Sequence, residues 1–233
     1  MPLRLEFAAA LDRLRESLLV MVSLVTRVMT DATNALVDDD VPLARRALER
    51  GWLIHATTAD LEAEITDLLA RQQPVARDLR TLIASLRIVA ALDRMGDLAI
   101  HLAELVVVRE PDRVVPDSMR DLVSRMGELD AALSTRVGWA LYSDDERLAA
   151  ECEREDDEVD RLYRDVFHRL TSPDWTAGVR AGVDLAVAAR FFERFADQSV
   201  TIARRLVFAR TGELPPSQRT SSSGRSSRDT PPA

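Results

Sequence analysis

Apolar residues recur every three or four positions along most of this chain, which is the spacing of one face of an α-helix. The first such seam consists of Phe7, Leu11, Leu14, Leu18, Met21, Val25, Val28, Ala32 and Ala35. A seam of this length predicts a long helix that partner helices cover. An acidic run at residues 38–40, followed by Pro42, predicts the start of a second helix. That helix is expected to run to about Gln72, and Pro74 predicts the start of a third. The pattern breaks at residues 110–113 and then resumes.

The part of the chain after this break repeats the part before it. Residues 35–55 align without gaps on residues 140–160, at an offset of 105 residues, and residues 92–97 match residues 192–197 at an offset of 100. An internal repeat of this size predicts an all-α fold of two tandem, similar three-helix bundles, joined end to end and containing six long helices. The expected divisions are a first bundle at residues 1–112, a second at residues 113–212, and a disordered Pro/Ser/Arg-rich tail at residues 213–233.

The composition changes this picture little but excludes some classes of function. The net charge is -8, which argues against a general nucleic-acid binder, because phosphate contacts require a basic face. The single cysteine, Cys152, excludes an intrachain disulfide and is typical of a reducing compartment. The chain has no signal peptide and no continuous run of about 18 apolar residues. We therefore expect a cytoplasmic protein that does not span a membrane.

Three helical segments carry two acidic residues four positions apart. These pairs are Asp93/Asp97, Asp156/Asp160 and Glu193/Asp197. The spacing places both carboxylates of a pair on one face of a helix, about one turn apart. Asp93 and Glu193 also lie on the apolar seams of their helices. A carboxylate on a partly buried seam must be paired, protonated or bound to a metal.

Two explanations of these acids stay open at this point. In the second half, the four carboxylates are expected to converge from two antiparallel helices and to hold a hard cation such as Mg²⁺ or Mn²⁺, with iron also possible. Alternatively, nearby arginines satisfy the carboxylates without any metal. The arginines in question are Arg94, Arg154, Arg161 and Arg194. In the first half, Gly51 and His55 occupy the positions of Asp156 and Asp160, so His55 is a weaker candidate ligand.

Evidence for catalysis is poor. The sequence has no Gly-rich phosphate loop, no pair of cysteines and no local signature of a Ser-His-Asp triad. Asp165 and His168 have the carboxylate-x-x-His spacing of di-iron bundles, but those proteins need a Glu-x-x-His motif on each of two helices. We therefore expect a protein that is not an enzyme and that has no organic cofactor.

Two long segments resemble signature segments of the PhoU family. These are RQQPVARDLRTLIASLRIVAALDRMGDLAIHLAELV at residues 71–106 and RFFERFADQSVTIARRLV at residues 190–207. The segments LLVMVSLV and NALVDDDVPLA are similar to that family as well. The resemblance covers essentially residues 1–212.

The resemblance implies a fold of two tandem three-helix bundles whose acidic motifs can bind multinuclear metal clusters, with iron, manganese, magnesium or zinc as candidates. The ligands that it implies are Asp93 and Asp97 in the first repeat and Asp156, Asp160, Glu193 and Asp197 in the second. The chain departs from the family pattern at Gly51 and His55, and at Asp93, where glutamate is usual.

The resemblance also implies a function. Proteins of this family are negative regulators of phosphate uptake and of the phosphate-starvation regulon. They are thought to connect the ATPase subunit of the phosphate ABC transporter with the sensor histidine kinase of that regulon. We accordingly expect a homodimeric adaptor that reaches the membrane only through these partners and binds no nucleic acid. The alternatives are a di-metal carboxylate bundle with oxidase chemistry and a metal-free helical scaffold.

Overall fold

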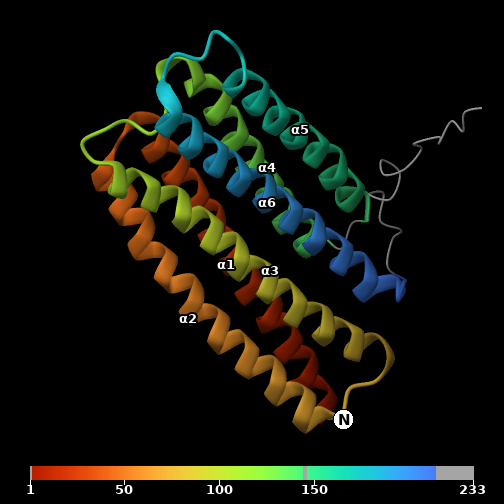
Figure 1. Ribbon diagram of the computed structural model, residues 1–233. Helices are drawn as coiled ribbons and strands as arrows, with labels where there is room; N and C mark the ends of the chain where they lie inside the picture. The colour runs from red at the N-terminus through yellow and green to blue at the C-terminus, as the bar shows by residue number, and fades with distance from the viewer. Residues whose placement is uncertain (1, 144–145, 214–233) are drawn as a thin grey trace, which may run out of the picture.

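Six long α-helices make up a computed structural model that describes residues 2–143 and 146–213 (Figure 1). Their bounds are α1 (Pro2–Asp38), α2 (Val41–Gln72), α3 (Ala76–Arg109), α4 (Arg120–Ser143), α5 (Glu146–Leu170) and α6 (Gly178–Thr211), with a short 3-10 helix, η1 (Asp117–Met119), before α4. No strand occurs among the described residues. The predicted all-α fold with six long helices is therefore confirmed. The tail predicted to be disordered lies outside the described residues, apart from Glu213.

The boundary between α1 and α2 follows from local chemistry. Asp40 caps α2: its Oδ1 accepts the backbone N–H of Leu43 at 2.8 Å and so satisfies one of the amides that a helix start leaves open. The helix ends at Gln72, as expected, and Gln73 closes it in the left-handed conformation with φ of 44°. The third helix begins at Ala76, two residues after the proline that predicts it.

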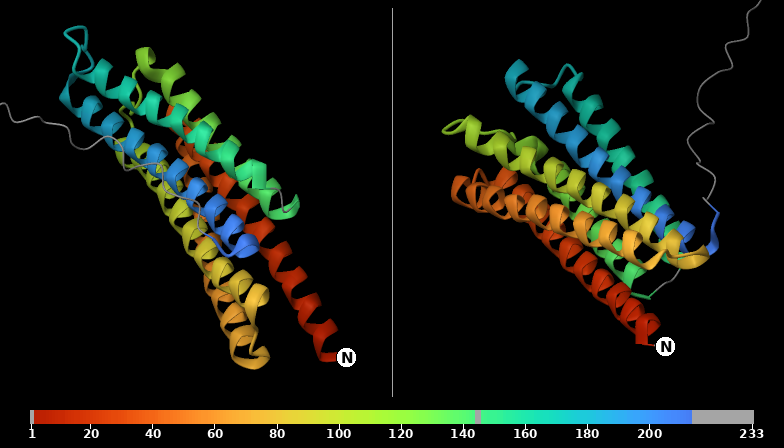
Figure 2. Two further views of the ribbon diagram at one scale, coloured as in Figure 1. Left: turned by 90° about the vertical axis from the view of Figure 1, so that its right-hand side faces the viewer. Right: turned by 90° about the horizontal axis from the view of Figure 1, so that it is seen from below.

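The two bundles lie side by side in space. Within each bundle the three helices pack on one another, and between bundles α1 packs against α4 and α3 against α6. The helices α2 and α5 lie on the outside (Figures 1 and 2). The two repeats follow one another along the chain, as expected, but the two bundles pack side by side and not end to end. The physical reason is visible in α3, where Leu92, Met95, Leu98 and Ala99 are all buried, so that apolar residues cover more than one face and need neighbours on two sides.

Close approach of α1 and α4 occurs twice, at equivalent places. Gly127 of α4 lies so close to Thr33 of α1 that a Cβ atom at position 127 would overlap with the threonine side chain. At Gly138, a Cβ atom would lie 3.3 Å from Val22 Cγ1. Residues 22 and 127 are equivalent in the repeat, as are residues 33 and 138, because each pair is 105 positions apart. The two contacts are therefore related by an approximate two-fold axis, and α1 and α4 run antiparallel.

The contact between α3 and α6 also runs antiparallel. Arg109, near the end of α3, donates to the buried Asp184, near the start of α6, at 2.5 Å. This hydrogen bond raises the pKa of Arg109 above its ordinary value. Closer to the middle of both helices, the ring of His101 stacks on Phe191 with centroids 5.2 Å apart. Polar and aromatic contacts thus tie the two repeats together along their second shared face.

The helix α1 is long and apolar enough, between Leu5 and Asp38, to cross a membrane by length and composition alone. Sequence reasoning expected no such segment. More than half of its most apolar window, 56%, is buried inside the protein, which is what a core helix of a helical bundle also shows. Its predicted seam is buried or half-buried throughout.

The variant Gly127→Ala should lower the free energy of unfolding by about 1–3 kcal/mol, because the added methyl group overlaps with a stiff, buried threonine side chain. Gly138→Ala is the matched control. There the contact is looser, and the gain in helix propensity of up to about 1 kcal/mol offsets the crowding. Urea unfolding of both variants measures the difference. Equal stability of the two would contradict the proposed tight crossing.

Candidate functional site

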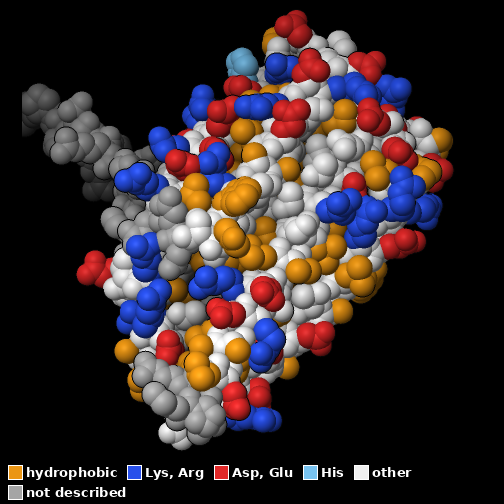
Figure 3. All heavy atoms as spheres, turned by 180° about the vertical axis from the view of Figure 1, so that it is seen from behind, with side chains coloured by type: hydrophobic (Ala, Val, Ile, Leu, Met, Phe, Trp, Pro, Cys, Tyr) orange, Lys and Arg blue, Asp and Glu red, His pale blue; other side chains and the backbone are white. Residues whose placement is uncertain are grey.

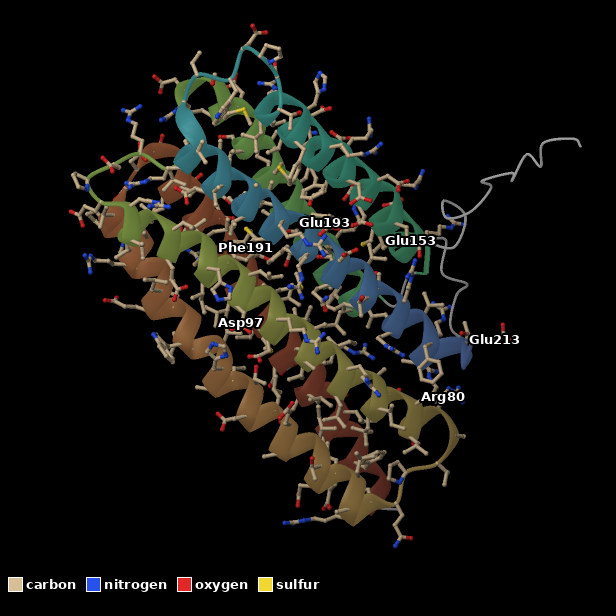
Figure 4. All side chains as sticks on the ribbon, in the orientation of Figure 1. Arg80, Asp97, Glu153, Phe191, Glu193 and Glu213 are labelled. Atoms are coloured by element: carbon tan, nitrogen blue, oxygen red, sulfur yellow. The ribbon has the colours of Figure 1, made fainter. Side chains whose placement is uncertain are left out.

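The acids predicted on α5 and α6 gather around one pocket in the second bundle. Its volume is about 410 Å³, and three of the four predicted ligands line it: Asp156, Asp160 and Asp197. The fourth, Glu193, is buried with 7% of its surface exposed, and Arg190 donates to its Oε2 at 2.5 Å. Among the other residues that line the pocket, Arg204 donates to Glu153 at 2.8 Å. Figure 4 labels Glu153 on α5 and Glu193 on α6. The structure therefore brings the two predicted acidic pairs of the second repeat together.

A further buried carboxylate, which sequence reasoning did not identify, comes from α4. Asp130 is fully buried, and neither of its oxygens has a hydrogen-bond partner among the described residues. Burial raises the pKa of Asp130 well above its ordinary value, and the nearby carboxylates of Asp156 and Glu193 raise it further. Asp156 is itself only 8% exposed. The centre of the second bundle thus holds three buried acids, one from each of its helices.

The sequence does carry a signal for Asp130. The buried seam of α4 consists of Val123, Met126, Asp130, Leu133 and Val137. Subtracting the repeat offset of 105 gives the corresponding seam of α1: Leu18, Met21, Val25, Val28 and Ala32. An aspartate therefore stands on a core seam where the first repeat has a buried valine. Extending the repeat alignment by ten residues toward the N-terminus would have found it.

Two of the four arginines that sequence reasoning named contact acids outside the predicted pairs. Arg154 lies 4.0 Å from Glu151, and Arg161 lies 3.5 Å from Glu158. Both contacts are between residues three positions apart on the same helix, and ion pairs of this kind contribute little to stability.

The first repeat arranges its residues differently. His55 of α2 lies between the two acids of α3, with Nδ1 3.0 Å from Asp93 Oδ1 and Nε2 3.4 Å from Asp97 Oδ1. Figure 4 labels Asp97 on α3. Thr58 also donates to Asp93 Oδ1, at 2.9 Å. A Cβ atom at position 51 would overlap with the side chain of Ile100. The structure thus brings the three predicted residues of this repeat together, with the ring of His55 in contact with both acids.

Comparison with known proteins decides the family. The PhoU domain matches the chain twice, at residues 18–106 and 123–206. The chain belongs to the PhoU family. A protein of Mycobacterium leprae, named phosphate-specific transport system accessory protein PhoU homolog 1, is 36% identical over 213 residues, which are 91% of this chain and 96% of that protein. The similarly named PhoU homolog 2 of Mycobacterium tuberculosis is also 36% identical over 213 residues, 91% of this chain and 100% of that protein.

Solved structures agree with this assignment. The crystal structure of PhoU from Pseudomonas aeruginosa superposes with a TM-score of 0.80 at 29% identity, over 89% of this chain and 100% of that one. PhoU from Streptococcus pneumoniae gives a TM-score of 0.79 at 24% identity, over 90% of this chain and 99% of that one, which shows the shared fold. The resemblance to the PhoU family is therefore confirmed.

Metal binding by this PhoU-family chain stays a prediction for all seven residues named for it. Among the described residues, no three His, Cys, Asp or Glu side chains converge closely enough to ligate one ion. The second repeat nevertheless fits a cation, because its donors are all carboxylate oxygens and Asp130 is buried without a hydrogen-bond donor. In the first repeat, by contrast, the imidazole of His55 already contacts both acids.

Replacing Asp130 by valine, the residue at the equivalent position of the first repeat, should raise the free energy of unfolding of the metal-free protein. A buried polar group without a partner costs about 1–3 kcal/mol, and valine removes that cost. The gain should grow with pH. Because the pKa of Asp130 is raised, the folded protein holds a proton that the unfolded chain releases, so stability falls as pH rises from the unfolded pKa toward the folded one.

Urea unfolding of both proteins at about pH 5 and about pH 8, in the presence of a chelator, measures this difference. The reverse change at the equivalent core position, Val25→Asp, is the matched control and should destabilise the protein. A valine variant that is less stable than the parent at both pH values would show that Asp130 has a stabilising partner.

Proposed function

We propose that this protein is a non-enzymatic regulator that represses phosphate uptake and the phosphate-starvation regulon when phosphate is plentiful. The observation that carries this proposal is the match of both PhoU domains, together with 36% identity over 91% of the chain to proteins named phosphate-specific transport system accessory proteins. The fold supports it as well, because a body of long packed helices offers wide, rigid surfaces for contact with other proteins.

In this proposal the protein acts in the cytoplasm, as a homodimeric adaptor between the ATPase subunit of the phosphate ABC transporter and the sensor histidine kinase. Its described surface suits contacts with proteins. Between α1 and α4 an open groove of about 820 Å³ has Trp139 and Tyr142 on its wall, and both side chains are more than half exposed. Figure 3 shows this side of the molecule, with hydrophobic side chains across its middle between arginines and acids. Exposed aromatic residues of this kind are typical of protein interfaces.

We further propose that the second repeat holds a divalent metal ion, with magnesium, manganese, iron or zinc as candidates. Its candidate binding residues are five acids of this bundle, which would have to draw closer around the ion: Asp130, Asp156, Asp160, Glu193 and Asp197. A bound cation supplies the positive charge that so many neighbouring carboxylates require. Because these acids come from α4, α5 and α6, their shared ligand would hold the three helices at fixed positions and so define the surface that partners meet. The alternative is a metal-free scaffold. Metal analysis of the purified protein distinguishes it from a metal-binding protein.

Deletion of the gene should leave phosphate-regulon genes expressed in phosphate-rich medium, because the link that silences the kinase is lost. Transcript levels of the transporter genes, measured in rich and poor medium, test this. Complementation with the parent gene is the control. Normal repression in the deletion strain would reject the regulatory proposal.

The tagged protein should capture the transporter ATPase and the sensor kinase from membrane extracts. The variant Glu193→Ala/Asp197→Ala should capture less of both if the second-repeat acids shape the docking surface. The matched control is Asp93→Ala/Asp97→Ala, at the equivalent positions of the first repeat. Equal capture by all three proteins would separate partner binding from the acids, and capture of neither partner by the parent would reject the adaptor role.

A further inference from the structure

The two repeats place very different chemistry on five equivalent positions. In the second repeat these positions hold Asp130, Asp156, Asp160, Glu193 and Asp197, and in the first they hold Val25, Gly51, His55, Asp93 and Asp97. Where the second repeat has five carboxylates, the first repeat therefore has two carboxylates, one imidazole and two residues without a polar side chain. A set of only two acids needs much less positive charge to balance it than a set of five.

In the first repeat, the imidazole of His55 directly contacts both remaining acids. Its Nδ1 lies 3.0 Å from Asp93 Oδ1 and its Nε2 lies 3.4 Å from Asp97 Oδ1, so the ring bridges the two acids. The hydroxyl of Thr58 also donates to Asp93 Oδ1, at 2.9 Å. Asp93 therefore already has polar partners within the first repeat, and Asp97 lies beside the same ring.

Space for a further ligand is also missing in the first repeat. Gly51 stands where the second repeat has Asp156, and a Cβ atom there would lie 2.5 Å from Cδ1 of Ile100. Isoleucine is stiff at χ1, so it cannot easily turn away. At the equivalent position of the second repeat the smaller Val200 lines the acidic pocket. The packing of Ile100 on Gly51 therefore fills the place from which a ligand on α2 would reach the site.

We propose that the first repeat holds no metal ion and that His55 instead performs the structural role of the cation, tying α2 to α3 through Asp93 and Asp97. The protein would then have a single metal centre, in the second repeat. This inference rests on the proposed cation site of the second repeat, but its statement about His55 can be tested separately.

Arginine substitutions at equivalent positions distinguish a bridging residue from a metal ligand. Arginine can donate to both carboxylates but cannot ligate a metal, because it has no lone pair to offer. Calorimetric titration with Mn²⁺ should give the same stoichiometry for His55→Arg as for the parent. Asp160→Arg, the matched change in the second repeat, should weaken Mn²⁺ binding at least about tenfold. Loss of Mn²⁺ binding by His55→Arg would overturn the inference.

Thermal unfolding in the presence of a chelator tests the bridging role without any metal. His55→Leu should lower Tm by roughly 2 °C, since it removes the polar contact that the two acids share, and about 1 kcal/mol corresponds to 2–4 °C for a chain of this size. His55→Arg should unfold near the parent temperature. Unfolding of His55→Leu at the parent temperature would overturn the bridging role.

The two experiments separate the inference from the proposal beneath it. If the parent binds no Mn²⁺, the cation site of the second repeat is rejected, and so is a single metal centre. The bridging role of His55 then still stands or falls on the Tm values. A bound ligand stabilises the state that binds it. If Mn²⁺ raises Tm of the parent and of His55→Arg but not of Asp160→Arg, the cation site of the second repeat and the absence of a metal ion from the first are both supported.

Discussion

Burial of several carboxylates in one helical bundle is the constraint on which the rest of this structure depends. A carboxyl removed from water must be protonated, hydrogen-bonded or balanced by positive charge. The second bundle brings one buried acid from each of its three helices to a common centre, and the only fully buried one, Asp130, lies on the α4 seam. The arginines observed nearby, such as Arg190 and Arg204, approach from the partly exposed side of α6. Protonation of Asp130, whose pKa is raised by burial, is one way to meet this requirement, and the proposed cation is another.

The first bundle shows what the same backbone frame becomes when that constraint is removed. Valine replaces the buried aspartate on the seam, glycine lets Ile100 pack closely, and His55 bridges the remaining acids. Each change is individually modest, but together they exchange an acidic pocket for a packed, hydrogen-bonded contact. Duplication of a fold therefore does not require duplication of its chemistry, because function resides in the side chains that the fold carries.

The arrangement of the two bundles gives this difference a consequence. Two antiparallel contacts, α1 with α4 and α3 with α6, join the repeats along their lengths, so a change in either bundle has a packed path to the other. The ion pair of Arg109 with the buried Asp184 lies in the second of these contacts.

The sequence by itself determined the helices, the repeat and the acidic pairs. Heptad spacing, helix-starting prolines and the capping aspartate act within a few residues, so the helix bounds could be predicted closely, for example the end of α2 at Gln72. The resemblance to the PhoU family also required only the sequence. The spacing of acids at four residues placed Asp156 with Asp160, and Glu193 with Asp197, on shared faces because a single helix fixes that geometry.

The tertiary structure decided everything that depends on contacts between helices. It showed that the bundles lie side by side, that Asp130 from a third helix joins the acids of the second repeat, and that Ile100 fills the place of an acid in the first. It also showed that both ring nitrogens of His55 face carboxylates. Period and spacing describe one helix at a time. Which side chains of different helices meet depends on how the seams interlock, and that is settled only when the whole core is packed.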